Sequence, residues 1–584
     1  MRKLIIGILL LVTANVFSQS LYYVANAGND ANPGTIGLPW KTIQKVNSTT
    51  FPANSYVHFK RGDKFYGSLI RNTNNIAKYL DYGTGALPII SGATQLTTWI
   101  KTGTNKYYAN IIADSTLNIV TLDGVPQGIA RYPNIDAANR GYLTYKGVAD
   151  ATTNTGFSRT KIRSTIAGNW VGYKGIVRDN DWRHVKVRFT ADNSDTLTFI
   201  QDFAYNIGGT AGLEPTKDNF TYFLIDDTSF LDKNGEYKYQ KNLNRLYMYF
   251  ADDNPAAHTI IASSVDTLMN INGSDNLIVE NLRFEYGNQF TINGAANNAI
   301  TIRNCESVFG GGIGFGFYRL SNSLIENNYL ADIMGDGMYI NSPTYPYPNV
   351  TIQDNSVFRI GIIPGMSCIG LGAEAVGISA GVRIGLKMYR NFVSQTGVDC
   401  FKFQGGDLEV AYNWGEYGCS VGQDHAIFYS YWDRADTAAY RNRWFHHNFA
   451  SNAIGAALPG GTVRASAFYF DGSSGYFIAE NNVGFNCPRK VFNLNIDTNV
   501  IIRNNICLMS DTSTHTQAMG IGIQENYAIP ITGVQVKGNV IYGYKTTQSL
   551  IYYTGGAVTA AAIPGQTGGL GVIADLNKER VYKL

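Results

Sequence analysis

The chain carries a short unit that recurs from about residue 277 to residue 544. Each unit has a few alternating apolar residues, an asparagine and a second apolar run, as in LIENNYLADI, VTIQDNSVF and VIIRNNICL. The units follow one another at intervals of 22 to 24 or 27 to 36 residues, a period typical of repeat proteins. The recurring asparagines are Asn281, Asn304, Asn328, Asn355, Asn391, Asn413, Asn448, Asn482, Asn505 and Asn539.

One unit is too short and too apolar to bury itself, so the units must stack into a solenoid with a continuous core. Alternation at period two, β-branched residues and the lack of helical periodicity predict strands. A β-helix explains the asparagines, because a stacked Asn can hydrogen-bond the neighbouring turns at every coil corner. A β-propeller or sandwich also has short strands, but neither requires an Asn at the same place in each unit.

The asparagine pattern is absent between about residues 133 and 261, where aromatic, charged and Gly-rich turns stand instead. We interpret this stretch as an inserted β-rich subdomain. The expected organisation is a signal peptide (1–18), a cap with the first coils (19–132), the inserted subdomain (133–261), the β-helix with the catalytic cleft (262–556) and a C-terminal cap or tail (557–584). The fold class is therefore all-β.

Composition and charge limit the classes of binding partner that can be expected. A net charge of +3 over 584 residues gives no reason to expect nucleic acid or an anionic membrane. Arg2 and Lys3 precede an apolar run and small residues, which predicts a signal peptide and a secreted or periplasmic protein without a membrane span. We expect a monomer. The six cysteines match no metal or disulfide framework, and we interpret them as small buried hydrophobes.

Several segments together carry a family resemblance: LYYVANAGNDANPGTIGLPWKTIQKVN, VHFKRGDKFYGSL, YGTGALPIISGA, GIARYPN, WVGYKGIVRDNDW and FLDKNGEYKY. They resemble secreted right-handed parallel β-helix proteins of the pectin-lyase-like superfamily, which is rich in glycoside hydrolases and polysaccharide lyases. In combination they are similar to the β-helix hydrolases with α-L-fucosidase and xylanase activities. The resemblance implies a right-handed solenoid and a polysaccharide or oligosaccharide substrate, and it leaves the sugar open.

Three segments place a glycine and an aspartate before an apolar strand: GDGMYI with Asp336, GVDCFKF with Asp399 and GQDHAIFY with Asp424. These aspartates follow their coil's asparagine by about 8, 8 and 11 residues, which predicts that they share one side of the solenoid. Asp471 follows its strand instead. The simplest alternative is that each aspartate caps a tight turn.

Glycoside hydrolysis needs two facing carboxyl groups, one of them protonated, and adjacent coils of a β-helix lie about 4.8 Å apart. We predict Asp399 and Asp424 as the catalytic pair, with Asp336 and Asp471 in reserve. Adjacent coils suit a retaining pair, whereas Asp336 and Asp399 suit inversion. The predicted substrate-binding residues around them are His425, Lys402, Tyr429, Trp432, Arg434, Glu374 and Glu416.

Two other functions fit part of this pattern. A polysaccharide lyase would use Lys402, His425 or Tyr429 as the base beside a uronate carboxyl. Hydrolysis needs no cofactor, whereas a lyase would make calcium possible, although no dense carboxylate cluster is present. A non-catalytic glycan-binding β-helix would need an extended aromatic face and no phased carboxylates.

Overall fold

The computed structural model describes residues 19–71, 75–148, 161–164, 169–178, 182, 184–193, 196–201, 220–342, 349–368, 374–431, 441–457, 461–496, 499–513, 518–525, 533–545, 548–555, 558–564, 572–575 and 580–583. The predicted signal peptide (1–18) and the predicted site residues Trp432 and Arg434 lie outside the described residues.

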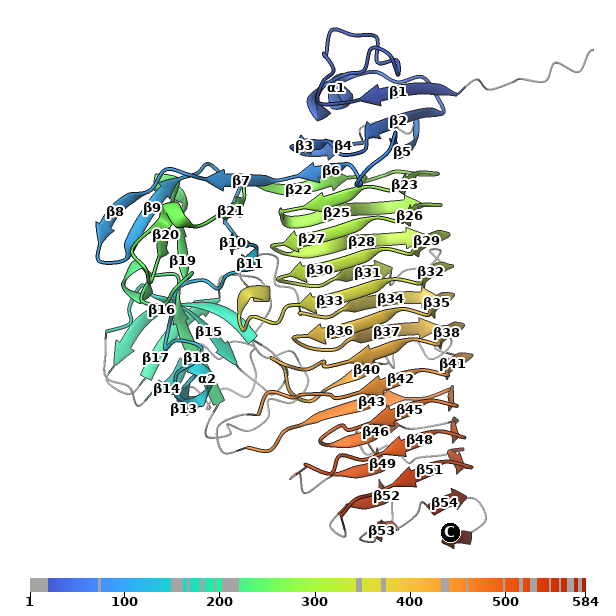
Figure 1. Ribbon diagram of the computed structural model, residues 1–584. Coiled ribbons are helices and arrows are strands. Elements are labelled where there is room, and N and C mark those ends of the chain that lie inside the picture. The colour runs from blue at the N-terminus through green and yellow to red at the C-terminus, as the bar shows by residue number, and fades with distance from the viewer. Residues whose placement is uncertain are drawn as a thin grey trace, which may run out of the picture.

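Three long sheets run down the molecule and form a parallel β-helix (Figure 1). Sheet 1 has 13 strands, from β1 (Ser20–Val24) to β50 (Gln535–Lys537). Sheet 2 has 12 strands, from β3 (Lys64–Tyr66) to β51 (Val540–Tyr542). In each regular coil the chain passes from sheet 1 to sheet 2 to sheet 3. The predicted all-β solenoid is thus confirmed.

Sheet 3 has 13 strands and carries Lys402, His425, Tyr429 and Asp471 of the predicted site residues. Its strands are β4 (Leu69–Ile70), β22 (Val265–Asn270), β25 (Gly287–Asn298), β28 (Ile313–Ser321), β31 (Met338–Ser342), β34 (Ile378–Ile384), β37 (Phe401–Gly406), β40 (His425–Tyr431), β43 (Ala465–Ser474), β46 (Lys490–Ile496), β49 (Met519–Glu525), β52 (Ser549–Gly555) and β53 (Val558–Pro564). All neighbours pair in parallel except β52 and β53, which form an antiparallel end to the sheet.

A ladder of buried asparagines lies at the corner between sheets 1 and 2. In it the side-chain amide of one Asn donates to Oδ1 of the next, for example Asn391 to Asn413 at 2.9 Å, and that Oδ1 also accepts the backbone N–H of Asn391 at 3.0 Å. The residue before each ladder position has a positive φ, as at Asp354 and Arg390. The ladder comprises Asn328, Asn355, Asn391, Asn413, Asn448, Asn482, Asn505 and Asn539.

The prediction was wrong for the first two asparagines. Asn281 and Asn304 occupy the positive-φ position instead, at 57° and 53°. The ladder position after Asn304 is taken by Cys305, whose backbone N–H donates to Asn328 Oδ1 at 3.0 Å. Asparagine is well suited to both places, because it tolerates the left-handed region and also hydrogen-bonds turns.

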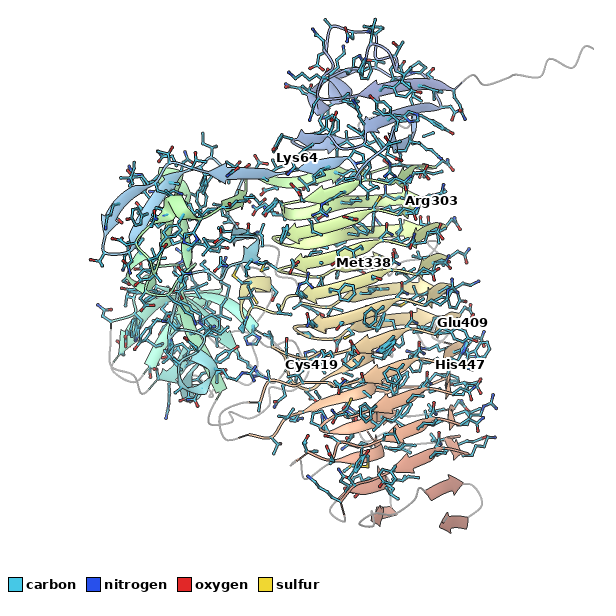
Figure 2. The ribbon with its side chains drawn as sticks, viewed as in Figure 1. Lys64, Arg303, Met338, Glu409, Cys419 and His447 are labelled. Carbon is cyan, nitrogen blue, oxygen red and sulfur yellow. The ribbon has the colours of Figure 1, made fainter. Side chains whose placement is uncertain are left out.

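The solenoid core is filled by the inward residues of the alternating strands. Along β37, Phe401 and Phe403 are buried in the core whereas Lys402 and Gln404 lie on the outer face. All six cysteines are buried and free, as predicted. In Figure 2, Met338 lies inside the solenoid, and Arg303, Glu409 and His447 lie along the edge away from the inserted subdomain.

The inserted subdomain packs beside the solenoid (Figure 1) and has three antiparallel sheets. Its strands are β7 (Ala93–Leu96), β8 (Ile100–Gly103), β9 (Lys106–Asn110), β10 (Val120–Leu122), β11 (Val125–Pro126), β12 (Arg131–Tyr132), β13 (Leu143–Val148), β14 (Lys161–Ser164), β15 (Lys174–Arg178), β16 (His184–Asn193), β17 (Thr196–Gln201), β18 (Phe220–Ile225), β19 (Tyr237–Gln240), β20 (Arg245–Tyr249) and β21 (Ile260–Ser263).

The subdomain begins earlier than the predicted residue 133. Strand β7 pairs with β21 and not with a coil, so the chain leaves the solenoid after β6 (Ile89–Ser91) and returns at β22. The short strands before residue 133 alternate like coil strands, so the sequence pattern does not separate them from the solenoid.

Helices are few and short: α1 (Ile43–Ser48), α2 (Ala138–Gly141), η1 (Thr228–Phe230), η2 (Lys241–Leu243), η3 (Pro255–Ala257) and η4 (Met366–Cys368). Helix α1 lies over the first coil and buries Ile43 and Val46 in the solenoid core, as expected for an N-terminal cap. A hairpin of β54 (Val572–Asp575) and β55 (Arg580–Lys583) lies at the other end. Within the described part of the chain, none of the helices has the length and apolar character needed to cross a bilayer.

Candidate functional site

The corner between sheets 2 and 3 presents the same carboxylate contact on two coils. Asp336 Oδ1 accepts the backbone N–H of Val376 at 2.8 Å, and Asp399 Oδ1 accepts that of Ala426 at 2.9 Å. Met338, Ile378, Phe401 and Phe428 pair with one another across neighbouring strands of sheet 3. Asp336 lies two residues before Met338, and Asp399 lies two residues before Phe401. Asp336 and Asp399 are therefore equivalent positions two coils apart, as their matching distance from the ladder asparagine predicted.

Asp424 does not share this phase. Ala426 occupies the equivalent corner position in its coil, so Asp424 lies two residues earlier. Its carboxylate contacts Arg489, and Arg464 lies 3.3 Å away. Burial alone would raise the pKa of Asp424, but the two guanidinium charges outweigh it and lower the pKa. Asp424 is thus held as a carboxylate in an ion pair with residues of the two following coils.

Asp399 is fully buried and has an unusual local environment. Its Oδ1 lies 3.3 Å from Nδ1 of His425, close enough for charge attraction but not aligned for a hydrogen bond. Within the described residues, Asp399 Oδ2 and the nearby Gln423 Oε1 have no hydrogen-bond partner although both are buried. Buried polar atoms are nearly always satisfied in native folds, and an exception requires an explanation such as a functional role.

Lys402 is the cation of this corner. Its ammonium contacts the carboxylate of Glu374, and the charges of Asp399 and Asp336 also act on it. Burial lowers the pKa of Lys402, but the three carboxylates outweigh burial and raise the pKa. Lys402 is therefore protonated at neutral pH. Its Nζ lies 5.9 Å from the ring centroid of Tyr429 on the next coil.

Asp336 has the opposite balance. Burial, reinforced by the charge of Glu374, raises the pKa of Asp336 to about 7. The backbone N–H of Val376 and the charge of Lys402 act in the other direction but do not compensate. A carboxyl group with this pKa carries a proton for much of the time at neutral pH, as a general acid must.

Polar side chains continue along the outer face of sheet 3. Tyr429 donates to Asp471 Oδ2 at 3.0 Å, and Asn495 donates to Asp471 Oδ1 at 2.8 Å and to Tyr469 at 2.9 Å. Burial and then the charge of Asp471 raise the pKa of Tyr429. Asp471 is thus part of a hydrogen-bonded row beside Lys402, and not of the Asp336–Asp399 corner.

Of the remaining predicted residues, His425 and Glu374 lie at the corner between sheets 2 and 3, whereas Glu416 lies within sheet 2. Glu416 ends β39 (Trp414–Glu416) in sheet 2, where Ser394 lies 3.4 Å from its carboxylate. Burial lowers the pKa of His425, but the charge of Asp399 outweighs burial and raises the pKa.

Sequence reasoning missed Lys490, Arg464 and Arg489. Lys490 is buried, and its Nζ donates to Asn493 at 2.8 Å and to Gln524 at 2.6 Å. Burial and the charge of Arg489 lower the pKa of Lys490 to about 7. The only local signal was an Arg-Lys pair directly before the apolar run of β46, which by itself does not distinguish a buried lysine from a solvated one.

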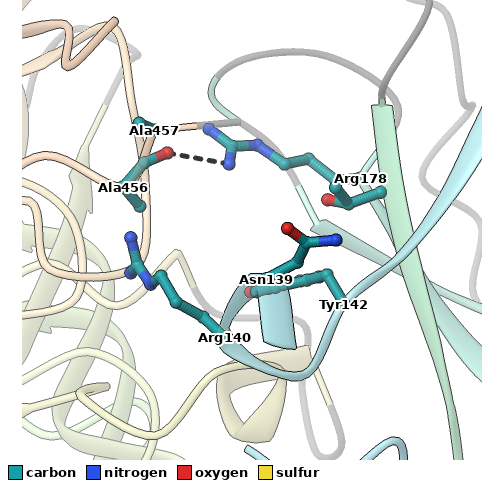
Figure 3. Close-up of a pocket in the computed structure, with 7 residues that line it drawn as sticks. Asn139, Arg140, Tyr142, Arg178, Ala456 and Ala457 are labelled. Carbon is teal, nitrogen blue, oxygen red and sulfur yellow. Dashed lines mark hydrogen bonds between the residues drawn. The ribbon is translucent and has the colours of Figure 1, made fainter. Parts of the chain in front are cut away.

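Hydrogen bonds to backbone carbonyls join the inserted subdomain and the solenoid beside the site. His425 Nε2 lies 3.1 Å from the carbonyl of Trp182, and Arg140 and Arg178 each donate to a solenoid carbonyl at 3.0 Å, of Ser420 and Ala456 respectively. A cavity of about 200 Å³ lies at this contact (Figure 3). The site is therefore covered from the subdomain side.

Metal ligation has no geometric support here. Across the part of the chain that the structure describes, no group of three or more His, Cys, Asp or Glu side chains lies in an arrangement that could hold a metal ion. The calcium that a lyase would use stays a prediction tied to that alternative.

Comparisons with known proteins bear on the fold. Residues 248–389 match the family model described as "Right handed beta helix region", which confirms the predicted handedness. A sequence comparison with curated proteins gave no match. One solved structure, titled "Glycoside hydrolase", has a TM-score of 0.60 at 13% identity and covers 83% of this chain and 96% of its own. At this identity the likeness shows the fold.

Two further solved structures are less similar. The complex of XylC with xylose has a TM-score of 0.45 at 10% identity, covering 85% of this chain and 77% of its own. A rhamnogalacturonan lyase has a TM-score of 0.38 at 12% identity, covering 88% and 86%. The family-model match and the structure with a TM-score of 0.60 confirm the resemblance to right-handed parallel β-helix proteins as one of fold.

Proposed function

We propose that this protein is a glycoside hydrolase that cleaves a polysaccharide at the corner between sheets 2 and 3. The observation that carries the proposal is the repeated corner, in which Asp336 and Asp399 occupy equivalent positions two coils apart and both act on the charge of Lys402. Two coils separate the backbones by roughly 9–10 Å. This separation is near the roughly 6.5–9.5 Å between the carboxyl groups of inverting enzymes.

The two carboxyl groups have different roles in this proposal. Asp336, with its pKa raised to about 7 by burial, donates a proton to the leaving oxygen. Asp399 is oriented through Oδ1 by the N–H of Ala426 and accepts a proton from the attacking water at Oδ2. Asp424, the predicted partner of Asp399, instead holds Arg464 and Arg489 in place.

Both proposed catalytic carboxyl groups are buried, with Asp336 only 2% exposed. The scissile bond can reach them only if the substrate displaces covering side chains such as His425 and Lys402. Displacing Lys402 would also remove its positive charge and favour the protonated form of Asp336 further. Substrate binding and protonation of the acid are thus coupled.

The lyase alternative needs a deprotonated base beside the sugar. The protonated form of each predicted base is favoured. Burial lowers the pKa values of Lys402 and His425, but the charges of Glu374 and Asp399 respectively outweigh burial and raise them. Burial and then the charge of Asp471 raise the pKa of Tyr429. This favours hydrolysis over β-elimination. The fold neighbour titled "Glycoside hydrolase" supports the same choice as an analogy of fold.

We further propose that the protein acts outside the cytoplasm as a monomer, since residues 1–18 carry the features of a signal peptide and the substrate is a polymer. The sugar chain would lie along the outer face of sheet 3, over Tyr429 and Asp471. Tyrosine rings offer stacking surfaces for sugars.

The test is incubation of the purified chain with neutral, uronate-rich and sulfated glycans, following new reducing ends and ultraviolet absorbance together. Reducing ends without absorbance are expected, since hydrolysis creates no double bond. Asp399→Asn and Asp336→Asn are each expected to lower the rate by about 10²–10⁴-fold. Circular dichroism of each variant verifies the fold.

Asp354→Asn is the matched control. Asp354 lies at a coil corner like the site residues, but its carboxylate pairs with Arg390 at the surface, 2.7 Å away. Its cleavage rate should equal that of the unmodified chain. Absorbance in step with reducing ends would identify a lyase, and full activity in Asp399→Asn would contradict the assigned residues.

A further inference from the structure

A second cavity, of about 370 Å³, lies at the corner between sheets 2 and 3 on the coils that follow Asp399. It spans the ends of β39, β42 (Phe449–Ser451), β45 (Val483–Phe485) and β48 (Ile506–Leu508), which follow one another along the solenoid (Figure 1). Its volume falls within the roughly 300–1,000 Å³ of small-molecule pockets. Among the described residues its lining comprises one aromatic ring, two amides, three hydroxyls and four apolar side chains.

Three lining residues, Tyr417, Asn452 and Asn486, occupy one position on successive coils. The backbone N–H of Tyr417 donates to the carbonyl of Ser451, the residue before Asn452. The N–H of Asn452 donates in the same way to the carbonyl of Phe485, the residue before Asn486. All three have a positive φ, of 53°, 53° and 51°. They therefore form a row along the solenoid, with one side chain on each coil and a repeat of about 4.8 Å.

This row places an aromatic ring beside two amides. Tyr417 is 44% exposed, so its ring offers a flat apolar surface that ends in a hydroxyl. Asn486 Nδ2 donates to Asn452 Oδ1 at 2.8 Å, and no donor in the described part of the chain reaches Asn486 Oδ1. Asn486 thus keeps an acceptor for a ligand in the cavity.

The mixture of groups in the lining matches a neutral sugar. A sugar ring has an apolar C–H face, for which Tyr417 and the half-exposed Ile454 provide contacts. Its hydroxyls both donate and accept, as do amides and hydroxyl side chains. None of the lining residues that the structure describes is charged. Lys545 donates to the backbone carbonyl of Ser513 at 2.9 Å but is not one of them. A carboxylate or sulfate would therefore lack the charged partner that such groups prefer.

The cavity adjoins the corner that carries Asp399. Tyr417 lies two residues before Cys419, whose backbone N–H donates to the carbonyl of Val398 at 2.8 Å. Val398 directly precedes Asp399 in the chain. The coil of Tyr417 follows the coil of Asp399, on the side away from Asp336. A polymer seated at the Asp336–Asp399 corner can therefore extend along the stacked coils into this cavity.

We propose that the cavity at the ends of β39, β42 and β45 binds a neutral sugar unit of the substrate, with the sugar ring against Tyr417 and its hydroxyls on Asn452 and Asn486. This inference rests on the proposed function in taking a sugar polymer as the substrate. It adds that the unit bound beside the cleavage site carries no charge.

The experiment measures binding without turnover. The methyl glycosides of glucose, galactose, mannose and xylose are titrated against the full chain by ligand-observed NMR at low and high NaCl. Methyl glucuronide is titrated beside them, because it differs from methyl glucoside only in its carboxylate. We expect at least one neutral glycoside to bind, and to bind more tightly than methyl glucuronide. Its affinity should not change with salt, since screening acts on charge attraction.

Tyr417→Asn tests the aromatic ring. Asparagine already occupies the equivalent position on the next two coils, so the variant should fold. Loss of the ring should weaken binding of the neutral glycoside by about 2- to 10-fold. Tyr412→Asn is the matched control: Tyr412 lies on the same coil, is 55% exposed and has a φ of 59°, but it lies at the corner between sheets 1 and 2. This control should bind like the unmodified chain.

Asn486→Gly tests the amide. Glycine adopts a positive φ readily, so the variant removes the side chain and keeps the backbone. We expect binding to weaken by about 2- to 10-fold, a loss typical of a neutral hydrogen bond. Asn481→Gly is the matched control, because Asn481 lies on the same coil with a φ of 55° but at the corner between sheets 1 and 2. It should bind normally.

The outcomes separate the two proposals. Asp399→Asn should bind the neutral glycoside normally while losing cleavage. Binding that depends on Tyr417 in a chain that cleaves no glycan would overturn only the proposed function. The inference is overturned if none of the neutral glycosides binds, if methyl glucuronide binds as tightly as they do, or if Tyr417→Asn binds like the unmodified chain.

Discussion

Asp336 is the residue at which function and stability oppose each other most clearly. Its carboxyl group is buried beside Glu374, and its pKa is raised to about 7 from an ordinary value of 3.8. A carboxyl whose pKa is raised on folding stabilises the fold fully only below the unfolded value. That contribution is lost as the pH rises through the folded value. At pH 8 the ionised Asp336 therefore destabilises the fold.

Asp336→Asn should remove this destabilisation of the fold at high pH. The amide keeps an oxygen for the N–H of Val376 but carries no charge. We expect the variant to be more stable than the unmodified chain at pH 8, by about 4 kcal/mol at most, and to show little difference at pH 4. Thermal denaturation at both pH values measures this, and an equal effect at the two pH values would contradict it. The same variant should cleave about 10²–10⁴-fold more slowly.

The site residues show what local sequence reasoning can find. Asp336 and Asp399 were located because a glycine followed closely by an aspartate recurs at the same distance from the ladder asparagine. The prediction that Asp424 shares their corner position was wrong, because its longer distance from Asn413 reflects extra residues in the preceding loop. Its partners Arg464 and Arg489 lie 40 and 65 residues away in the chain. Such contacts leave no local signal.

At the scale of the elements, the asparagine ladder fixes the register of the coils. Asn413 Oδ1 accepts both the backbone N–H and the side-chain amide of Asn391, and its own amide donates to Met388 and Asn448. Each coil thus satisfies the polar groups of its neighbours at a corner that water does not reach. The ladder was predictable from sequence because each coil repeats it.

Asn413→Ala should break this chain of hydrogen bonds. Two donors of Asn391 lose their acceptor, and each buried unsatisfied group costs about 1–3 kcal/mol. We expect a loss of roughly 2–4 kcal/mol, seen as a lower denaturant midpoint by circular dichroism. Asn304→Gly is the control, because Asn304 lies at the positive-φ turn outside the ladder and glycine adopts that conformation readily. Equal losses in both variants would contradict the ladder's role.

In the whole molecule, the subdomain and the solenoid share a hydrophobic core, which forms the joint between them. Met334 and Met366 of the solenoid loops pack in one cluster with Ile176 and Phe223 of the subdomain. The sequence predicted two units but not this joint, because the residues that meet come from segments far apart in the chain. The joint matters for function, since His425 and the cavity of about 200 Å³ both lie along it.

Gly365 tests the joint directly. It has a φ of +84°, and an added Cβ would lie 2.7 Å from Cζ of Phe223 and 3.0 Å from Cγ1 of Ile176. Gly365→Ala should therefore combine backbone strain with a clash across the joint. Gly273→Ala is the matched control, because Gly273 has a φ of +66° and open space around its Cβ position.

The difference between the two glycine variants isolates the contact between subdomain and solenoid. Both should lose about 1 kcal/mol to the backbone conformation, and Gly365→Ala should lose about 1–3 kcal/mol more to overpacking. Hydrogen exchange should rise in β15 and β18 of Gly365→Ala alone, and its cleavage rate should fall as the cover over His425 shifts. Identical midpoints, exchange and rates in the two variants would show that the subdomain does not depend on this contact for its position.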